Sequence, residues 1–348
     1  TAIVAFFART LARGAFRGAN VLTRWGERRT SGIMPVPPLP LRIPNPQGGG
    51  RIPGGEGSAF TLSCPEPLAV PIVIGAPHGG RHYPDDVMGA MRDPGPAMLK
   101  LEDRLIDLLA AEVARMSGAP LIVAHAPRAM IDLNRSPDDI DWAMIAGPAR
   151  SDLAKGGVNR RARTGLGLVP RRLPGMGEIW KGRLAREDLD ARIETIHKPY
   201  HAALGVLLER VRDEWGAVLL IDLHSMPPLK PAGPGQQAAE FVIGDRFGAS
   251  CGDGLAAGAL NVLAAAERRV AHNRPYSGGY VLDRHGAPRR NIHALQIEVC
   301  RSAYLDAEMR DVGPRFAGVA RLLAQMVRSL AAQVSGLTSG DTIRQAAE

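Results

Sequence analysis

The sequence predicts an α/β fold with a mostly parallel mixed sheet and helices on both of its faces. Short, continuous apolar segments such as "PIVIGAP" at 71–77 and "AVLLIDL" at 217–223 are typical of strands that are buried on both sides. These segments alternate along the chain with stretches of helical periodicity, which indicates parallel strands joined by helices. The chain contains no GxGxxG motif, no P-loop and no internal repeat, so nothing indicates a nucleotide-binding or repeat architecture.

The first half of the folded body begins near Phe60 and places one helix between strands. The strand at 71–77 ends in the Gly-rich turn "PHGG". A helix is predicted over 101–117, because Gly118 is a typical stop and apolar residues recur at helical spacing, namely Leu105, Leu108, Leu109 and Val113. The segment "PLIVAHAPRAMIDLNRSP" at 120–137 predicts two short strands.

The second half of the body continues the same alternation. A long helical region is predicted over 184–216, with a break at Pro199. After the strand "AVLLIDL", a helix is predicted at 254–270, a strand at 294–305 and a last helix at 312–334. This order of elements completes the predicted α/β fold.

The chain divides into three parts by composition. Residues 1–30 form an acid-poor, Arg-rich amphipathic stretch, which is typical of a transit peptide, a membrane-surface helix or an extension without a catalytic part. Residues 31–58 are dense in Pro and Gly, as in a disordered linker. We therefore expect 1–58 to be poorly ordered, 59–335 to form a single domain, and 336–348 to be a frayed tail.

The net charge of +8 does not indicate nucleic-acid binding, because most of it lies in one terminal segment. Residues 1–51 contain eight arginines and a single acid, Glu27, so that they carry +7 and leave about +1 for the rest of the chain. A nearly neutral folded body lacks the basic surface that phosphate backbones require. No apolar run reaches the length of about 18 residues that spans a bilayer. We expect neither nucleic acid nor membrane as a partner of the folded domain.

Three cysteines, Cys64, Cys251 and Cys300, are too few for a disulfide framework. Unpaired cysteines are typical of a reducing compartment, so we expect the protein to be cytoplasmic. None of the three lies in a CxxC pair, which makes a thiolate zinc site improbable. The oligomeric state does not follow from these properties.

Polar side chains gather where the predicted strands end. His78 follows the first buried strand, His224 follows the strand "AVLLIDL", and Glu298 lies in the strand "ALQIEVC". Ligands of open α/β sheets bind beyond the carboxyl ends of the strands. Further polar residues occur near other predicted strand and helix ends: Arg128, Asp132, Asn134, Arg135, and the acidic pair Glu102 and Asp103.

This set of residues is the type that a catalytic metal site needs. Two histidines and one carboxylate, with an open fourth position, describe a catalytic zinc site. A further glutamate that is not a ligand suits a general base for a bound water. Two arginines suit an anionic substrate and a developing oxyanion.

Each of these residues also has a structural interpretation. A histidine at a strand end is more often structural than ligating, and Glu102 with Asp103 can be a simple charge pair at a helix N-terminus. Arg128 and Arg135 can pair with Asp132 or Asp138, and Asp222 can orient His224 or cap a turn. His82, His285 and His293 are weaker candidates for metal contact. Glu298 is the hardest to interpret structurally, because a carboxylate in an apolar strand requires a partner.

Seven segments, in the same order and at compatible spacing, resemble the N-formylglutamate amidohydrolase family. They are "PHGGRHYPDD", "EDRLIDLL", "RAMIDLNRSPDDID", "RIETIHKPYHAAL", "LLIDLHSMP", "IGDRFGASC" and "HALQIEVCRSAYLD". The resemblance covers about residues 60–330 and leaves out the Arg-rich start and the linker. It implies a fold similar to that of zinc carboxypeptidases and aspartoacylases.

The resemblance assigns roles to residues that match the family's motifs. His78 and His224 correspond to the zinc histidines, and Glu298 corresponds to the catalytic glutamate. Asn134 and Arg135 resemble the Asn-Arg pair that grips a substrate carboxylate. Arg128, at the start of the same segment, resembles the arginine that polarises the scissile carbonyl.

The third zinc ligand departs from the carboxypeptidase pattern. That pattern places an acid three residues after the first histidine, and Arg81 stands there in this sequence. The acid must therefore come from elsewhere, and the segment "LED" is the best source. We favour Asp103 over Glu102, since Asp103 aligns better with the aspartate that the resemblance implies.

The implied activity is a zinc-dependent hydrolysis of the amide of N-formylglutamate or a related N-acyl amino acid, as in histidine breakdown, with one Zn²⁺ per chain. The substrate is thus a small anion. The Gly-rich loop "YSGGYVLDRHGAP" at 276–288 is expected to close over it, with Tyr276, Tyr280 and Arg284 as contacts. The alternatives are a deacylase or peptidase of the same fold with another substrate, or a metal-free, catalytically inactive binding protein.

Overall fold

The computed structural model describes residues 46–147, 160–231, 233, 235 and 237–345, which all fall within one compact unit, Pro37–Glu348. The expectations for the Arg-rich start and for the linker up to residue 45 lie outside the described residues. Within the described part of the chain, no helix is both long enough and apolar enough to cross a membrane.

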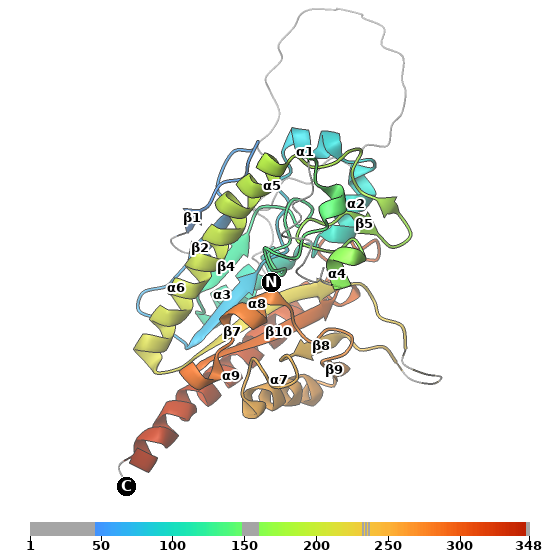
Figure 1. Ribbon diagram of the computed structural model, residues 1–348. Helices are drawn as coiled ribbons and strands as arrows, with labels where there is room; N and C mark the ends of the chain where they lie inside the picture. Colours follow the sequence, from blue (N-terminus) through green and yellow to red (C-terminus); the bar gives the residue numbers. More distant parts are fainter. Residues whose placement is uncertain (1–45, 148–159, 232, 234, 236, 346–348) are drawn as a thin grey trace, which may run out of the picture. The chain divides into compact units, whose positions relative to one another are not determined.

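A twisted sheet of eight strands forms the centre of the described fold (Figure 1). Four neighbouring strands in its middle are parallel, and the strands at the margins include antiparallel pairs. In order across the sheet the strands are β1 (Gln47–Gly49), β2 (Phe60–Ser63), β4 (Leu121–Ala124), β3 (Ile72–Ala76), β7 (Val218–Met226), β10 (Ile292–Cys300), β8 (Phe241–Gly244) and β9 (Val270–His272).

Helices cover both faces of this sheet (Figure 1). One face packs against α3 (Ile106–Ser117), α7 (Asp253–Ala265) and α9 (Phe316–Gln345). The other face packs mainly against α6 (Lys198–Trp215), with shorter elements at its end: α1 (Asp85–Ala90), α2 (Pro94–Leu101), α5 (Arg186–Arg192) and α8 (Tyr280–His285). A four-residue helix, α4 (Arg160–Arg163), and a small hairpin of β5 (Arg172–Leu173) and β6 (Gly177–Glu178) lie outside the main sheet, and short 3₁₀ helices form at Trp142–Met144, Pro288–Arg290 and Arg301–Ala303. The predicted α/β class is therefore confirmed.

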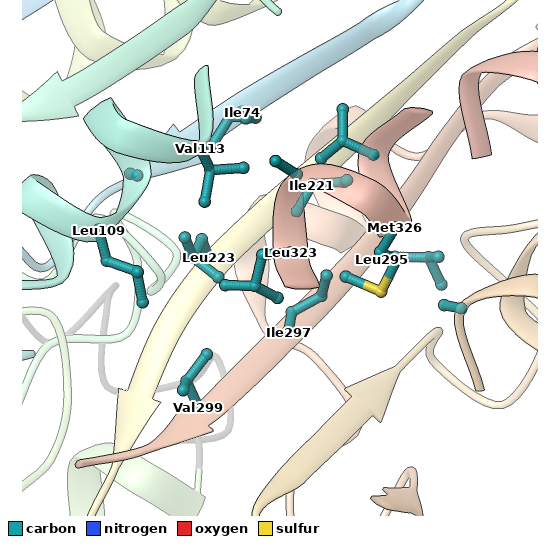
Figure 2. Packing of buried hydrophobic residues seen from close by; sticks show 14 of the residues in the cluster. Ile74, Leu109, Val113, Ile221, Leu223, Leu295, Ile297, Val299, Leu323 and Met326 are labelled. Atoms are coloured by element: carbon teal, nitrogen blue, oxygen red, sulfur yellow. The ribbon is translucent and has the colours of Figure 1, made fainter. Parts of the chain in front are cut away.

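Alternation along the long central strands divides their side chains between the two faces. Leu219, Ile221 and Leu223 of β7 belong to the cluster under α3 and α9, together with Ile297 and Val299 of β10, and Figure 2 shows part of this cluster. Their neighbours in sequence point to the opposite face, because successive side chains of a strand alternate. Asp222 and His224 of β7 and Gln296 and Glu298 of β10 therefore share the α6 face of the sheet.

Several elements differ from their prediction at the segment ends. The helix predicted over 101–117 begins only at Ile106, as α3, because residues 102–105 form a break after a separate helix, α2, that ends at Leu101. The second strand predicted within 120–137 does not form, because the chain after β4 runs as a loop held by turns. Pro199 does not break its helix: Ile193–His197 form a π-helical turn directly before α6, and the proline occupies the first turn of α6.

The boundaries of the folded body are also wider than predicted. β1 pairs with β2 in antiparallel register, and Ile52 is buried, so that the expected linker does not extend over residues 46–58. At the other end, α9 continues to Gln345, past the expected boundary at residue 335. A strand at 241–244 was not predicted; it pairs with β10 and widens the sheet.

Candidate active site

A cavity opens at the carboxyl ends of the central parallel strands, where open α/β sheets bind ligands. His78 follows β3, while His224 and Glu298 lie near the carboxyl ends of β7 and β10. These three side chains line the cavity together with those of Asp103 and Arg128. The residues that the sequence placed at separate strand ends are thus brought into one space.

Three buried side chains converge on one point of this cavity. His78, Asp103 and His224 each offer one ligand atom, and these atoms lie within 4.8 Å of one another. Asp103 Oδ2 lies 3.0 Å from Nδ1 of His224 and 3.5 Å from Nδ1 of His78. Two imidazole nitrogens and one carboxylate oxygen are therefore close enough together to contact one ion.

The opposite nitrogen of each histidine contacts a further carboxylate. Nε2 of His78 lies 2.7 Å from Asp132 Oδ1, and Nε2 of His224 lies 2.8 Å from Asp222 Oδ2. A carboxylate only accepts, so each Nε2–H donates, and in the neutral form of each imidazole Nδ1 then carries the lone pair. Carboxylates that orient ligating histidines in this way are a regular feature of metal sites.

The convergence of these groups fits a bound cation. When both imidazoles are neutral and both Nε2–H groups donate to carboxylates, two Nδ1 lone pairs and the Asp103 carboxylate face one another as three acceptors. Nδ1 of His78 is buried and has no hydrogen-bond partner, and Oδ1 of Asp222 is likewise without one. Three acceptors that face one another repel unless a positive charge lies between them. The donor set of two nitrogens and one oxygen is suited to a divalent transition metal.

The electrostatics of the described groups reflect the same crowding of carboxylates. Burial alone would lower the pKa of His224, but the charge of Asp222 and the hydrogen bonds with Asp103 and Asp222 raise it well above its ordinary value. Burial alone would raise the pKa of Asp103, and its bonds to both histidines hold it below its ordinary value instead. In the absence of a cation, a protonated His224 supplies positive charge to this site.

The break between α2 and α3 decides which acid faces the histidines. Leu105 has a left-handed backbone, with φ of 55°, and this turn separates Glu102 and Asp103 from α3. The amide of Asp103 donates to the carbonyl of His78, which ties the acid directly to the histidine segment. Glu102 instead points to Arg104, whose Nη1 lies 3.1 Å from its carboxylate. The structure thus brings Asp103, and not Glu102, to the two histidines.

Arg81 has a structural contact at the position where a carboxypeptidase would hold its acid ligand. Its guanidinium makes two bonds, of 2.5 and 2.7 Å, to the carboxylate of Asp107 in the first turn of α3. A bidentate pair of this kind is geometrically specific. Arg81 therefore fastens the "PHGG" turn to α3 and does not face the metal-ligand atoms.

Glu298 lies beside the convergence point on the same face of the sheet. In the parallel register of β7 and β10, Glu298 is the partner of His224. It is 7% exposed, and burial raises its pKa to about 7, despite the opposing effect of His224. One of its oxygens accepts a hydrogen bond of 2.8 Å from the amide of Gln296. A carboxyl group with a pKa near neutrality can exchange a proton at ordinary pH.

The loop after β4 carries the two predicted arginines. Asp132 anchors this loop: it contacts His78, accepts from the backbone amide of Asn134 at 2.8 Å, and accepts from Nε of Arg128 at 2.9 Å. The Arg128 guanidinium lines the cavity beyond this contact. Arg135 lines the cavity as well, while its Nε and Nη1 donate to the carbonyls of Leu166 and Asn134.

The predicted contacts from the loop at 276–288 are divided. Tyr276 lines the cavity, together with Ser277 to Gly279. Residues Tyr280–His285 form α8, and neither Tyr280 nor Arg284 lines the cavity. The ring of Tyr280 packs near those of His197 and His201, and Arg284 is exposed beside it. Both expected substrate contacts are thus placed away from the cavity wall.

The weaker histidine candidates lie outside the group of ligand atoms. His82 stacks on His125 at the surface, His285 contacts His201, and His293 accepts from the backbone of Gly252. Other residues line the cavity without having been singled out in the sequence: Lys100, Gln296 and Arg301. Only Gln296 had a signal, because it stands two residues before Glu298 and so shares its face of β10.

Comparison with known proteins agrees with this arrangement. Residues 70–305 match the sequence profile of the family described as N-formylglutamate amidohydrolase. An N-formylglutamate deformylase of Pseudomonas putida is 30% identical over 241 residues, which cover 68% of this chain and 82% of that protein. An N-formylglutamate deformylase of Pseudomonas aeruginosa is 28% identical over 243 residues, or 69% and 84% of the two chains.

Solved structures show the same relationship at the level of the fold. The crystal structure of an N-formylglutamate amidohydrolase from Ralstonia eutropha JMP134 has a TM-score of 0.70 and 35% sequence identity, and the match covers 79% of this chain and 98% of that chain. A gene product of Agrobacterium tumefaciens has a TM-score of 0.59 with 15% identity, covering 79% and 94% of the two chains. The second likeness shows similarity of fold alone.

Proposed function

The chain belongs to the N-formylglutamate amidohydrolase family and is a hydrolase acting on a linear amide, and from this premise we propose that it is a zinc-dependent N-formylglutamate deformylase. The products of this reaction are formate and glutamate. The observation that carries the proposal is the convergence of His78, Asp103 and His224 beside a buried Glu298.

Zinc is the metal that this donor set favours. Two imidazole nitrogens and one carboxylate oxygen, in a cavity that leaves a further position open, match a catalytic zinc site with one ion per chain. A zinc ion held by these residues would supply Lewis-acid chemistry, lowering the pKa of water and polarising the substrate carbonyl. Asp132 and Asp222 keep the two imidazoles in the tautomer that such binding requires.

Glu298 is the residue that moves the proton. Its pKa of about 7 allows it to accept a proton from water and to pass that proton to the leaving amine of the substrate. Arg128 lines the cavity with a guanidinium whose Nε is fixed by Asp132, so that its position toward a developing oxyanion is set in advance. Both groups act only if the amide is held between them.

The charge of the cavity wall favours a substrate with carboxylates. Four cations line it, Lys100, Arg128, Arg135 and Arg301, against the two acids Asp103 and Glu298. Arg135 is held by backbone carbonyls and is suited to one substrate carboxylate. Nζ of Lys100 has a long contact of 3.5 Å to a backbone carbonyl, and it is suited to a second carboxylate. N-formylglutamate carries two carboxylates, whereas most N-acyl amino acids carry one.

The cellular setting follows from the chemistry and from the cysteines. We place the enzyme in the cytoplasm, since three cysteines are too few for a disulfide framework. Release of glutamate from its N-formyl derivative is the kind of step that histidine breakdown requires.

The test is metal content by elemental analysis, paired with glutamate release from N-formylglutamate and from a panel of N-acyl amino acids. We expect about one zinc per chain and release from N-formylglutamate. If the protein contains zinc but hydrolyses only another N-acyl amino acid, it is a deacylase or peptidase with that substrate and not an N-formylglutamate deformylase. Absence of zinc, with no activity after zinc is added, would refute the proposal. Glu298→Gln should keep the metal and lose on the order of 10²-fold to 10⁴-fold in turnover.

A further inference from the structure

A chain of side-chain amides connects the edge of the cavity to the Glu298 carboxylate. The backbone amide of Val281 donates to Asn134 Oδ1 at 2.9 Å, and Asn134 Nδ2 donates to Gln296 Oε1 at 3.2 Å. Gln296 Nε2 then donates to Glu298 Oε1 at 2.8 Å. Asn134 and Gln296 are 5% and 4% exposed, so water does not compete for these bonds.

The orientation of both amides follows from the two ends of this chain. A carboxylate oxygen of Glu298 can accept from Gln296, whereas the backbone N–H of Val281 can only donate. Gln296 therefore turns its NH₂ toward Glu298 and its oxygen toward Asn134. Asn134 must then turn its NH₂ toward Gln296 and its oxygen toward Val281. Reversal of either amide would place two donors or two acceptors against each other.

Strand geometry explains why Gln296 reaches Glu298. The two residues are separated by one position in β10, so their side chains stand on the same face of the sheet. In the parallel register they are the partners of Asp222 and His224. Gln296 thus contacts Glu298 in β10 as Asp222 contacts His224 in β7: in each strand the partner stands two residues earlier, on the same face.

This series of hydrogen-bonded amides also holds the loop that forms the edge of the cavity. A Cβ on Gly279 would lie 2.5 Å from Asn134 Oδ1, so the loop can approach Asn134 this closely only with glycine there. The carbonyl of Asn134 also accepts from the backbone amide of Tyr280. Both ends of the Asn134 amide are therefore bonded within the protein, while the residue also lines the cavity.

We propose that Asn134 and Gln296 are positioning residues, which fix the Glu298 carboxylate and tie its orientation to the cavity edge at residues 277–279. This inference rests on the proposed function, because it concerns how Glu298 works as a base. A carboxylate that is held at one oxygen keeps a single orientation, and proton transfer depends on hydrogen-bond reach to the reacting water. Substrate binding, by contrast, uses the cations of the cavity and does not need either amide.

The kinetic test is Gln296→Met, which keeps the length of the side chain and removes the amide. We expect kcat to fall about 100-fold, as for a misplaced catalytic group, with KM changed less than about three-fold and metal content unchanged. In a Glu298→Gln background, Gln296→Met should cause no further loss, because the group that it positions no longer acts as a base. Asn134→Asp, which presents an acceptor to Gln296 Oε1, should likewise lower kcat rather than raise KM.

Two kinetic results would overturn the inference. A rise in KM with kcat retained would make Gln296 or Asn134 a substrate contact. An equal fold-loss of activity from Gln296→Met in both backgrounds would make its effect independent of Glu298. Ser117→Ala serves as the control, since it removes a buried hydrogen bond at the end of α3, outside the cavity lining, and should leave kcat unchanged.

A measurement without substrate separates this inference from the proposed function. If the wild-type protein does not hydrolyse N-formylglutamate, the kinetic cycle is run on whichever N-acyl amino acid it does hydrolyse. In either case, urea unfolding of Gln296→Met, Glu298→Met and the double variant tests the contact itself. We expect the shifts in the unfolding midpoint to be non-additive, because each single variant leaves the other member of the pair unsatisfied, whereas the double variant removes both. Additive shifts would show that the two side chains do not act as a pair and would refute the inference.

Discussion

Replacement of Asp222 by Asn tests whether the carboxylates behind the histidines govern metal binding. Asp222 is fully buried, and its Oδ2 lies 2.8 Å from Nε2 of His224. Asparagine keeps the shape of the side chain and can still accept from Nε2, but it removes the negative charge. The change therefore isolates the electrostatic part of one hydrogen bond, since Oδ1 of Asp222 has no partner to lose.

The expected loss follows from the strength of that bond. A hydrogen bond to a charged group contributes about 1.5–3 kcal/mol, and a neutral one about 0.5–1.5 kcal/mol. The difference of about 1–1.5 kcal/mol corresponds to a roughly ten-fold weaker metal affinity. This value lies at the lower end of the roughly 10-fold to 100-fold range for changes behind metal ligands.

Zinc affinity would be measured by competition with a chromogenic chelator at fixed pH, on protein whose folding is verified by circular dichroism. Asp245→Asn is the matched control, because Asp245 also contacts a histidine nitrogen, Nε2 of His272 at 3.0 Å, and does not line the cavity. An Asp222→Asn protein that binds zinc as tightly as the wild type, or a control that weakens equally, would refute the reasoning.

Three further predictions concern other parts of the fold. Lys100→Met should lower kcat/KM for N-formylglutamate about ten-fold and leave kcat/KM for an N-formyl amino acid with an apolar side chain unchanged. Lys181 is an exposed lysine that also contacts a backbone carbonyl, and Lys181→Met should change neither value. Arg81→Met leaves the buried Asp107 without its partner, so urea unfolding should show a loss of about 3 kcal/mol with metal content retained. Burial lowers the pKa of His285 to about 4, below the value of about 6.5 in the unfolded chain. The unfolded state therefore binds the proton first, and the free energy of unfolding falls as the pH drops from 6.5 to 4. The loss should be on the order of 2 kcal/mol in the wild type and smaller in His285→Gln. A stability that is constant over this pH range would contradict the last of these.

Strand periodicity explains why much of the site was predictable. Ile221 and Leu223 identify β7 as a buried strand and face one side of the sheet. His224 directly follows Leu223, so its side chain has to face the opposite side. The same alternation in β10 places Glu298 beside His224, since the two strands are parallel neighbours. The sequence indicates strand ends and faces, and for parallel strands this is enough to bring distant residues to one edge.

The remaining features depend on loop geometry, which periodicity does not describe. Glu102 and Asp103 are equivalent in a pattern, and only the left-handed turn at Leu105 makes one face His78 and the other Arg104. Asn134 lines the cavity, but periodicity does not indicate that its side-chain oxygen accepts from Val281, 147 residues later in the chain. Tyr280 was expected there as well, and formation of α8 turns it toward His197 instead.

Close packing of the "PHGG" turn explains how His78 and Arg81 reach their partners in other segments. A Cβ on Gly79 would lie 2.7 Å from Cβ of Asp107, and a Cβ on Gly80 would lie 2.1 Å from the carbonyl oxygen of Ala126. Only glycines allow this turn to lie directly against the start of α3 and the loop after β4. The approach brings Asp103 to His78, and the Arg81–Asp107 pair then fastens the two segments. Asp103 can thus face His78 from another part of the chain, because the turn around His78 packs directly against the segment that follows Asp103.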